Sequence, residues 1–279
     1  MEASSPTGVA AVFAAVWLTL AGAPSLGAAE KAKPQDLAKA IASLRHIDPG
    51  KLTEAEKEQK GEEIAKAWNA LKAAGPAGIL AVRREIEALD KTGEKDDFFK
   101  LGAAALLWQT GKLAEADAIA KVWASTPLDT QYNYVFYTAF DAAQTQDPRA
   151  LPMLKACLRD KAGSVFLEQH FLDVKWPQTH EFVWGTFGPK GLPALDKVLE
   201  TSKDPVELVS AMILLGRAQY LPALPNVRKL AADKEDEVRR TAVMMLGFFG
   251  HPQDYDSLVA GLRSKDPKEA YAYAFALLE

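Results

Sequence analysis

Apolar residues recur at three- and four-residue steps along most of the chain, a spacing that places them on one face of an α-helix. From about Pro76 the pattern becomes repetitive. One element, with leucines four apart at Leu154 and Leu158 or at Leu195 and Leu199, recurs as residues 78–86, 150–158, 191–199, 220–230 and 254–262. Several copies carry proline near the start, where it favours the first turn of a helix. Each copy therefore predicts one helix.

A second repeated element follows a charged break and spans residues 204–216, 236–247 and 266–278. Asp204, Asp236 and Asp266 stand at or near its start, where a carboxylate accepts backbone N–H bonds and meets the positive end of the helix dipole. We therefore expect these aspartates to act as N-caps of a second helix in each unit.

Three glycines, Gly185, Gly216 and Gly247, follow one another at 31-residue intervals, each after a large apolar residue. A glycine just after a helix is typical of a left-handed turn, so we expect these residues to lead from one unit to the next. A fixed period of this length is typical of a solenoid, whose units bury their apolar faces only against neighbours. The sequence thus predicts an all-α protein, an α-solenoid of about six helical hairpins with an N-terminal helical cap.

The expected organisation has three parts: residues 1–29, a linker and helical cap over residues 30–75, and the repeats over residues 76–279. The cap consists of two predicted helices, from Leu37 to about Leu44 and from about Thr53 to Ala74, the second with an apolar stripe. The six units span about 76–111, 112–147, 148–188, 189–219, 220–250 and 251–279. The third is the longest and contains an insertion around Lys175-Trp176-Pro177, either a functional loop or a local bend.

Residues 236–247 read Asp-Glu-Val-Arg-Arg-x-Ala-x-x-x-Leu-Gly after a leucine-rich helix, and this motif resembles a HEAT repeat of the short, phycobilisome-lyase-like type. The resemblance is close over about 189–279 and looser over 76–188. It implies a HEAT-like solenoid in which Asp236 and Arg239 bridge neighbouring turns as a structural ladder. The second unit is equally compatible with a tetratricopeptide-like hairpin.

The first 29 residues carry a single charge, Glu2, and residues 8–23 are almost entirely apolar. Pro24 and the small residues Gly27 and Ala29 follow, as in a secretory signal peptide. No lysine or arginine precedes the apolar run, so an uncleaved anchor or a misassigned start codon is the alternative. We expect export to the periplasm or the extracellular space, with no stable membrane span after signal removal.

The formal net charge is −4, and lysine and arginine are scattered along the chain. Binding to nucleic acid requires a basic stripe that neutralises phosphates, so a nucleic-acid partner is not expected. The single cysteine, Cys157, excludes an intrachain disulfide and is expected to be a buried free thiol.

The sequence contains no catalytic constellation that we recognise. His180-Glu181 begins a zinc-protease motif, but Trp184 stands where the second histidine is required. His170, Asp173, His180 and Glu181 have scattered spacing, so no metal site is predicted from them. No nucleotide-binding loop or nucleophile motif is present either. We therefore expect no catalytic residues, no cofactor and no metal.

An aromatic run, Tyr132, Tyr134, Phe136, Tyr137 and Phe140, falls in a predicted second helix. Part of this run is expected in the core, although tyrosine also suits interfaces because it joins a rigid ring to a polar tip. Second helices line the concave surface of HEAT-type stacks. From helical phase we therefore expect a protein-binding surface with these members: Tyr132, Tyr134, Arg240 and Thr241.

The resulting hypothesis is an exported protein-binding or scaffolding module with no catalytic activity of its own. Because relatives of the short HEAT type include chromophore lyases, the resemblance also implies an alternative role in handling a chromophore or small ligand. A third alternative is a self-assembling structural protein, a homo-oligomer in which the apolar C-terminal hairpins of two chains pair.

Overall fold

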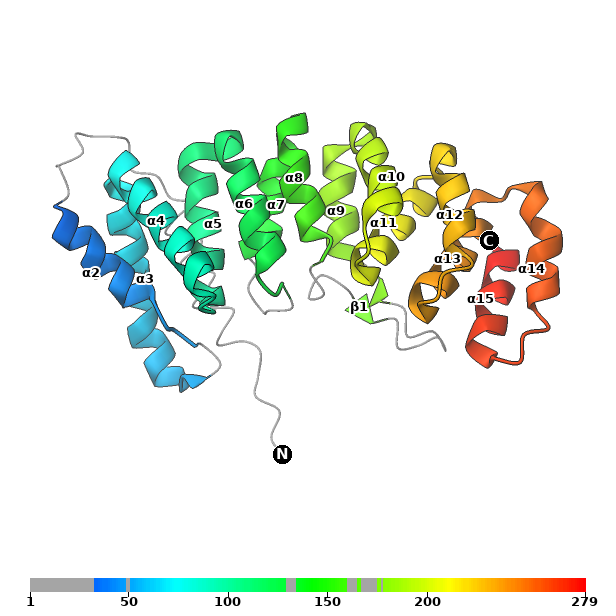
Figure 1. Ribbon diagram of the computed structural model, residues 1–279, viewed down its shortest axis with the longest axis horizontal. Helices are drawn as coiled ribbons and strands as arrows, with labels where there is room; N and C mark the ends of the chain where they lie inside the picture. Colours follow the sequence, from blue (N-terminus) through cyan, green and yellow to red (C-terminus); the bar gives the residue numbers. More distant parts are fainter. Residues whose placement is uncertain (1–32, 49–50, 129–133, 160–164, 167–174, 177) are drawn as a thin grey trace. The chain divides into compact units, whose positions relative to one another are not determined.

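The computed structural model describes residues 33–48, 51–128, 134–159, 165–166, 175–176 and 178–279, and it is built almost entirely of helices (Figure 1). This confirms the expected all-α solenoid, apart from one short pair of strands. The chain divides into two compact units, and the boundary between them falls after Thr138, inside helix α7 (Tyr134–Gln144). The α-helices are α2 (Pro34–Leu44), α3 (Glu54–Ala73), α4 (Pro76–Thr92), α5 (Asp97–Gly111), α6 (Ala116–Ser125), α7 (Tyr134–Gln144), α8 (Leu151–Cys157), α9 (Gln178–Phe187), α10 (Leu192–Thr201), α11 (Pro205–Arg217), α12 (Leu224–Leu230), α13 (Asp236–Phe249), α14 (Tyr255–Gly261) and α15 (Pro267–Leu278).

In the first unit, α2, α3 and α4 pack against one another and α5 packs against α4 and α6. Helix α3 begins at a capping box, in which the Glu56 backbone N–H donates to the Thr53 hydroxyl and the Thr53 N–H donates to the Glu56 carboxylate at 2.8 Å. The predicted stripe of α3 is buried, and its Trp68 stacks on Phe99 of α5 with ring centroids 5.7 Å apart. These contacts hold the first three helices as one layer beside α5.

In the second unit the helices pack in the order of the chain, as a HEAT-type stack requires. The second helices of successive hairpins lie side by side, α11 against α13 and α13 against α15, while α10 and α12 pair with the second helix of their own hairpin. Helices α11 and α13 are buried over most of their length, without a break from Leu208 to Gly216 in α11 and from Thr241 to Gly247 in α13, and nearly all of these buried residues are apolar.

Short 3-10 turns introduce the first helices of this unit, and proline occupies the first or second position of each: η3 (Pro148–Ala150), η4 (Pro189–Gly191), η5 (Leu221–Ala223) and η6 (Pro252–Asp254). Between α8 and α9 lies the unpredicted antiparallel pair β1 (Val165–Phe166) and β2 (Lys175–Trp176). The free thiol of Cys157 is buried as expected and donates to the Leu154 carbonyl at 3.0 Å.

Two of the three predicted aspartate N-caps are confirmed. Asp204 accepts from the Val206 backbone N–H and Asp266 accepts from that of Lys268, each at 2.9 Å. Asp236 is instead the first residue of α13 and pairs with Arg239 at 2.6 Å. Arg239 also reaches Glu269 of α15 at 2.7 Å, so this arginine joins two neighbouring second helices.

The predicted role of the three periodic glycines is wrong, although their period is correct. Gly216 and Gly247 lie inside α11 and α13, and the left-handed conformation falls three residues later, at Gln219 and Gly250. At Gly247 an added Cβ would lie 2.6 Å from the Cα of Ala276 in α15. Glycine is needed here because two helix backbones approach closely, and the turn is made by other residues.

Candidate binding groove

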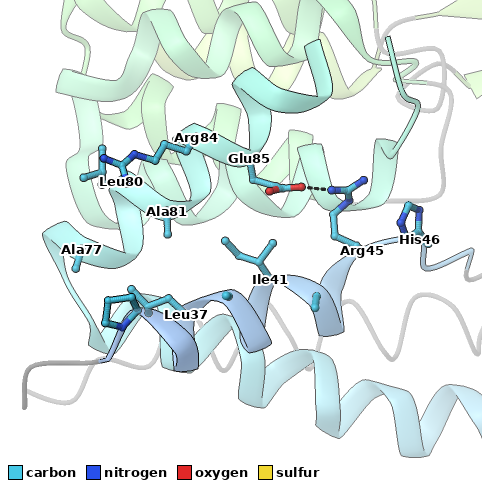
Figure 2. A pocket seen from close by; sticks show the side chains of 12 residues that line it. Leu37, Ile41, Arg45, His46, Ala77, Leu80, Ala81, Arg84 and Glu85 are labelled. Atoms are coloured by element: carbon cyan, nitrogen blue, oxygen red, sulfur yellow. Dashed lines mark hydrogen bonds and ion pairs between the residues drawn. The ribbon is translucent and has the colours of Figure 1, made fainter. Parts of the chain in front are cut away.

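An open groove of about 660 Å³ lies between α2 and α4 in the first unit (Figure 2). Helix α2 has apolar residues in the core and at the surface. Leu37 and Leu44 are buried, while Ile41 is only partly covered and lines the groove. The opposite wall includes Leu80, whose side chain is 49% exposed. Half of the apolar lining is alanine, and the apolar lining consists of Pro34, Leu37, Ala38, Ile41, Ala42, Ala77, Leu80 and Ala81.

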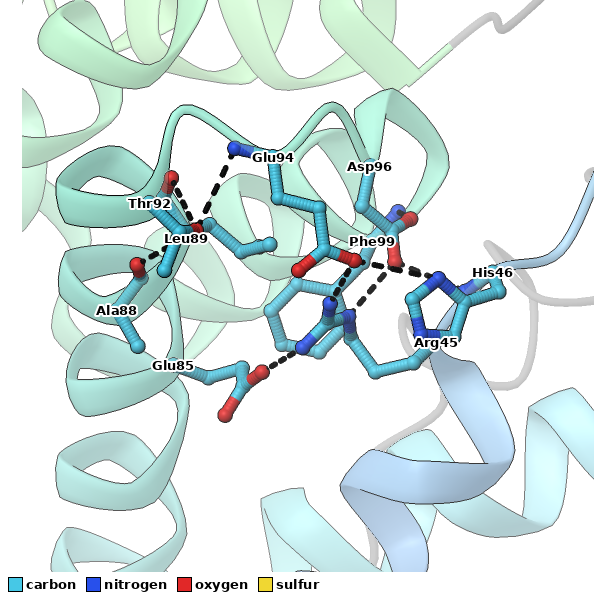
Figure 3. Close-up of polar contacts among 9 residues, drawn as sticks. All are labelled: Arg45, His46, Glu85, Ala88, Leu89, Thr92, Glu94, Asp96 and Phe99. Atoms are coloured by element: carbon cyan, nitrogen blue, oxygen red, sulfur yellow. Dashed lines mark hydrogen bonds and ion pairs between the residues drawn. The ribbon is translucent and has the colours of Figure 1, made fainter.

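The end of the groove is polar, because Arg45 follows the last residue of α2 and meets three carboxylates (Figure 3). Its guanidinium contacts Glu85 of α4, reaches Glu94 at 2.7 Å and donates from Nε to Asp96 at 2.8 Å. This group of residues, Arg45 with Glu85, Glu94 and Asp96, is the Arg45 cluster.

Asp96 is the buried centre of the Arg45 cluster and has two further backbone partners. It accepts from the His46 backbone N–H at 2.8 Å and, as the N-cap of α5, from the Phe99 N–H at 3.1 Å. Burial alone would lower the pKa of Arg45, but the hydrogen bonds to Asp96 and Glu94 outweigh it and raise that pKa above its usual value. The cluster therefore ties α2 to α5 with a permanently charged guanidinium and fixes the end of the groove.

Arg84 differs from Arg45, although both line the groove. Its side chain is exposed, and no carboxylate in the described part of the chain forms an ion pair with it. The groove thus has apolar walls and one accessible cation on α4, which suits an apolar segment that carries an acidic residue.

The structure does not bring the four predicted surface residues together. Tyr132 lies outside the described residues, and Tyr134 is the first residue of α7, with a side chain that is also outside the description. Thr241 is fully buried in α13, so its predicted place on an accessible surface is wrong. The Arg240 side chain is only 14% exposed and lies 3.9 Å from Asp236. Helical phase did not identify the accessible residues because α13 is buried on most sides from Thr241 onward.

His180 is buried in α9, and burial lowers its pKa to about 4 while the backbone of Cys157 acts in the opposite direction. Glu181 forms an ion pair with Arg217 of α11 at 2.9 Å. His170 and Asp173 lie outside the described residues. No group of three or more histidine, cysteine, aspartate or glutamate side chains is placed to hold a metal ion within the described ranges.

The exposed aromatic residue Phe182 was not predicted from the sequence. Phe182 of α9 is 58% exposed and stacks on Phe140 of α7, with ring centroids 4.9 Å apart. Phe140 belongs to the aromatic run, but the sequence gives no sign of its contact with α9. Tyr137 of the same run is 39% exposed.

The groove itself was also missed. The sequence predicted α2 and α3 as a cap, and α2 does pack one side against α3. The groove on its other side is formed together with α4, a contact that the sequence did not predict. The available signal was the run of alanines that alternates with Leu37 and Ile41, which is compatible with an ordinary packed helix too.

The hairpins of the second unit define a helical-repeat protein of the α-solenoid class. Within it, residues 192–278 match the family of HEAT repeats, a repeat type that generally mediates protein–protein interaction. The chain matches no curated protein and no solved structure. In the part of the chain that the structure describes, no helix is both long and apolar enough to cross a membrane.

Proposed function

We propose that this protein is an exported, non-catalytic scaffold that binds another protein through the groove between α2 and α4. The observation that carries the proposal is the groove itself, in which the apolar side chain of Leu80 is half exposed beside Arg84. Protein interaction is the general role of HEAT repeats, which occupy residues 192–278. Export is supported by the apolar segment 8–23 and the small residues after it.

The partner chemistry follows from the lining. An amphipathic helix would place an apolar side chain against Leu80 and Ile41 and remove them from water. Burial of this apolar surface favours binding by about 25 cal/mol for each Å² buried. An acidic residue of the partner beside Arg84 would set the register, because opposite charges favour one orientation over the others. The Arg45 cluster closes the end of the groove and already satisfies its own charges.

The test is a crosslinked pull-down from envelope extracts and culture medium. The bait is the chain in the form that the cell produces after any processing. Leu80→Glu places a charge in the groove, and the matched control is Leu221→Glu, because Leu221 is 56% exposed and does not line the groove. A partner retained by wild type and the control but lost with Leu80→Glu supports the proposal. Equal retention by both variants would contradict it.

Two further readouts in the same experiment address the remaining hypotheses. Alanine substitutions at Tyr132, Tyr134 and Arg240 test the surface that helical phase predicted. An absorbance scan and metal analysis of the purified protein test the chromophore-handling alternative, which a bound pigment or metal would favour.

A further inference from the structure

A second exposed apolar surface lies on α14, in the other compact unit. Tyr255, Val259 and Leu262 are spaced four and three residues apart, so they lie along one face of α14 and its C-cap. These side chains are 61%, 39% and 42% exposed, whereas Leu258 of the same helix is buried. We call these three residues the α14 stripe. Such a stripe matches the spacing of residues by which a helix enters a groove.

The α14 stripe and the groove are complementary in charge as well as in polarity. Asp256 is exposed beside Tyr255, and no cation in the described ranges forms an ion pair with its carboxylate. Arg84, on the wall of the groove, is likewise an exposed charge without a carboxylate in those ranges. Each surface therefore carries an apolar stripe, and the exposed carboxylate of Asp256 is opposite in charge to Arg84, while the exposed Arg263 follows Leu262 at the far end of the α14 stripe.

We propose that the occupant of the groove is the α14 stripe of a second copy of this chain, with Asp256 of one copy facing Arg84 of the other. This inference rests on the proposed function of the groove as a protein-binding site. The contact is heterologous, because the two partners use different surfaces, so it joins copies head to tail into a ring or an open filament. It differs from the pairing of two C-terminal hairpins, in which both copies would use the same surface.

Sedimentation velocity over a wide concentration range, with the chain as the cell processes it, measures the association. We expect the wild-type mass to rise with concentration beyond that of a dimer unless a ring closes. Leu80→Glu blocks the groove and Val259→Glu blocks the stripe, so each variant alone should stay monomeric. Both side chains are at least 39% exposed, which lets the charge face water in the monomer. Leu221→Glu is the matched control and should associate like wild type.

A mixture of the two defective variants gives the decisive readout. Leu80→Glu retains an intact stripe and Val259→Glu retains an intact groove, so the mixture should form a one-to-one complex that grows no further. The charge pair is tested in the same way: Arg84→Glu or Asp256→Arg alone should weaken association at least tenfold, and the double variant should recover most of it.

Three results would overturn the inference. Association of Leu80→Glu alone would show that the C-terminal hairpins pair with each other, and association of Val259→Glu alone would show that the groove pairs with itself. A wild-type monomer at every concentration would leave the groove to another protein. In that last case, the pull-down with Leu80→Glu still decides the proposed function by itself.

Discussion

Gly247→Ala tests the close approach of α13 to α15. An ideal Cβ at this position would lie 2.6 Å from the Cα of Ala276 and closer still to its carbonyl oxygen, so α15 must move as a backbone. Overpacking of this kind costs typically 1–3 kcal/mol. Because the contact here is with backbone atoms, which cannot move aside as a side chain can, we expect a cost at the upper end, about 3 kcal/mol. Alanine in place of glycine inside a helix returns about 1 kcal/mol. We therefore expect a net loss of about 2 kcal/mol.

The chain offers two matched controls at the same 31-residue period. Gly185 lies inside α9 and an added Cβ there meets no described atom within 4 Å, so Gly185→Ala should stabilise by up to about 1 kcal/mol. At Gly216 the nearest atom is the Met245 sulfur at 2.6 Å, part of a flexible side chain, so Gly216→Ala should fall between the other two.

Urea unfolding followed by circular dichroism measures the free energies, and the melting temperature gives a second readout. At about 2–4 °C for each kcal/mol in a chain of this size, Gly247→Ala should melt about 4–8 °C lower than wild type. Hydrogen exchange should show the loss first in α15, because repeats depend on their immediate neighbours. Equal stability of Gly247→Ala and Gly185→Ala would refute the reasoning.

Three further predictions concern the Arg45 cluster, His180 and the α3 cap. Arg45→Ala leaves the buried Asp96 without its cation and should lower the free energy of unfolding by about 2–3 kcal/mol, whereas Arg84→Ala, on the exposed wall, should change it by less than about 0.5 kcal/mol; urea titration compares them. The folded pKa of His180, about 4, lies below its ordinary value of 6.5, so the unfolded chain binds more protons and stability falls as the pH drops from about 6.5 towards 4. Between pH 7 and 4.5 this group should cost about 2.5 kcal/mol, and His180→Phe should lose that much less stability than wild type over the same range; equal losses would contradict the assignment. Thr53→Ala removes the capping box and should cost about 1 kcal/mol by thermal melting, with no effect expected from Thr201→Ala, whose hydroxyl bonds within its own helix.

The repeat pattern predicted the helices well because it records burial. Residues that stack four apart, such as Leu195 and Leu199, are buried in α10, and the two aspartate caps fall where their spacing placed them. The period of 31 residues was also informative, since it returns in the residues with positive φ at Gly188, Gln219 and Gly250. A period gives no phase, however, and glycine serves close packing and tight turns equally well.

The binding surface could not be predicted in the same way. In α13 every residue from Thr241 to Gly247 is buried, so helical phase alone did not show that Thr241 faces the core. The Arg45 cluster joins residues 40 to 51 positions apart, and no local spacing signals such a contact. The groove depends on how α2 and α4 pack, which is a tertiary property that amphipathicity leaves open.

The most direct test of the central claim is photo-crosslinking from the groove in living cells. A benzophenone side chain replaces Leu80, with the same replacement at Leu221 as the control, because both positions are about half exposed. The account predicts an adduct from position 80, mapped by mass spectrometry to an apolar helical segment, and to the residues around α14 if a second copy is the partner. Adducts no more abundant from position 80 than from position 221 would contradict the claim that this groove binds protein.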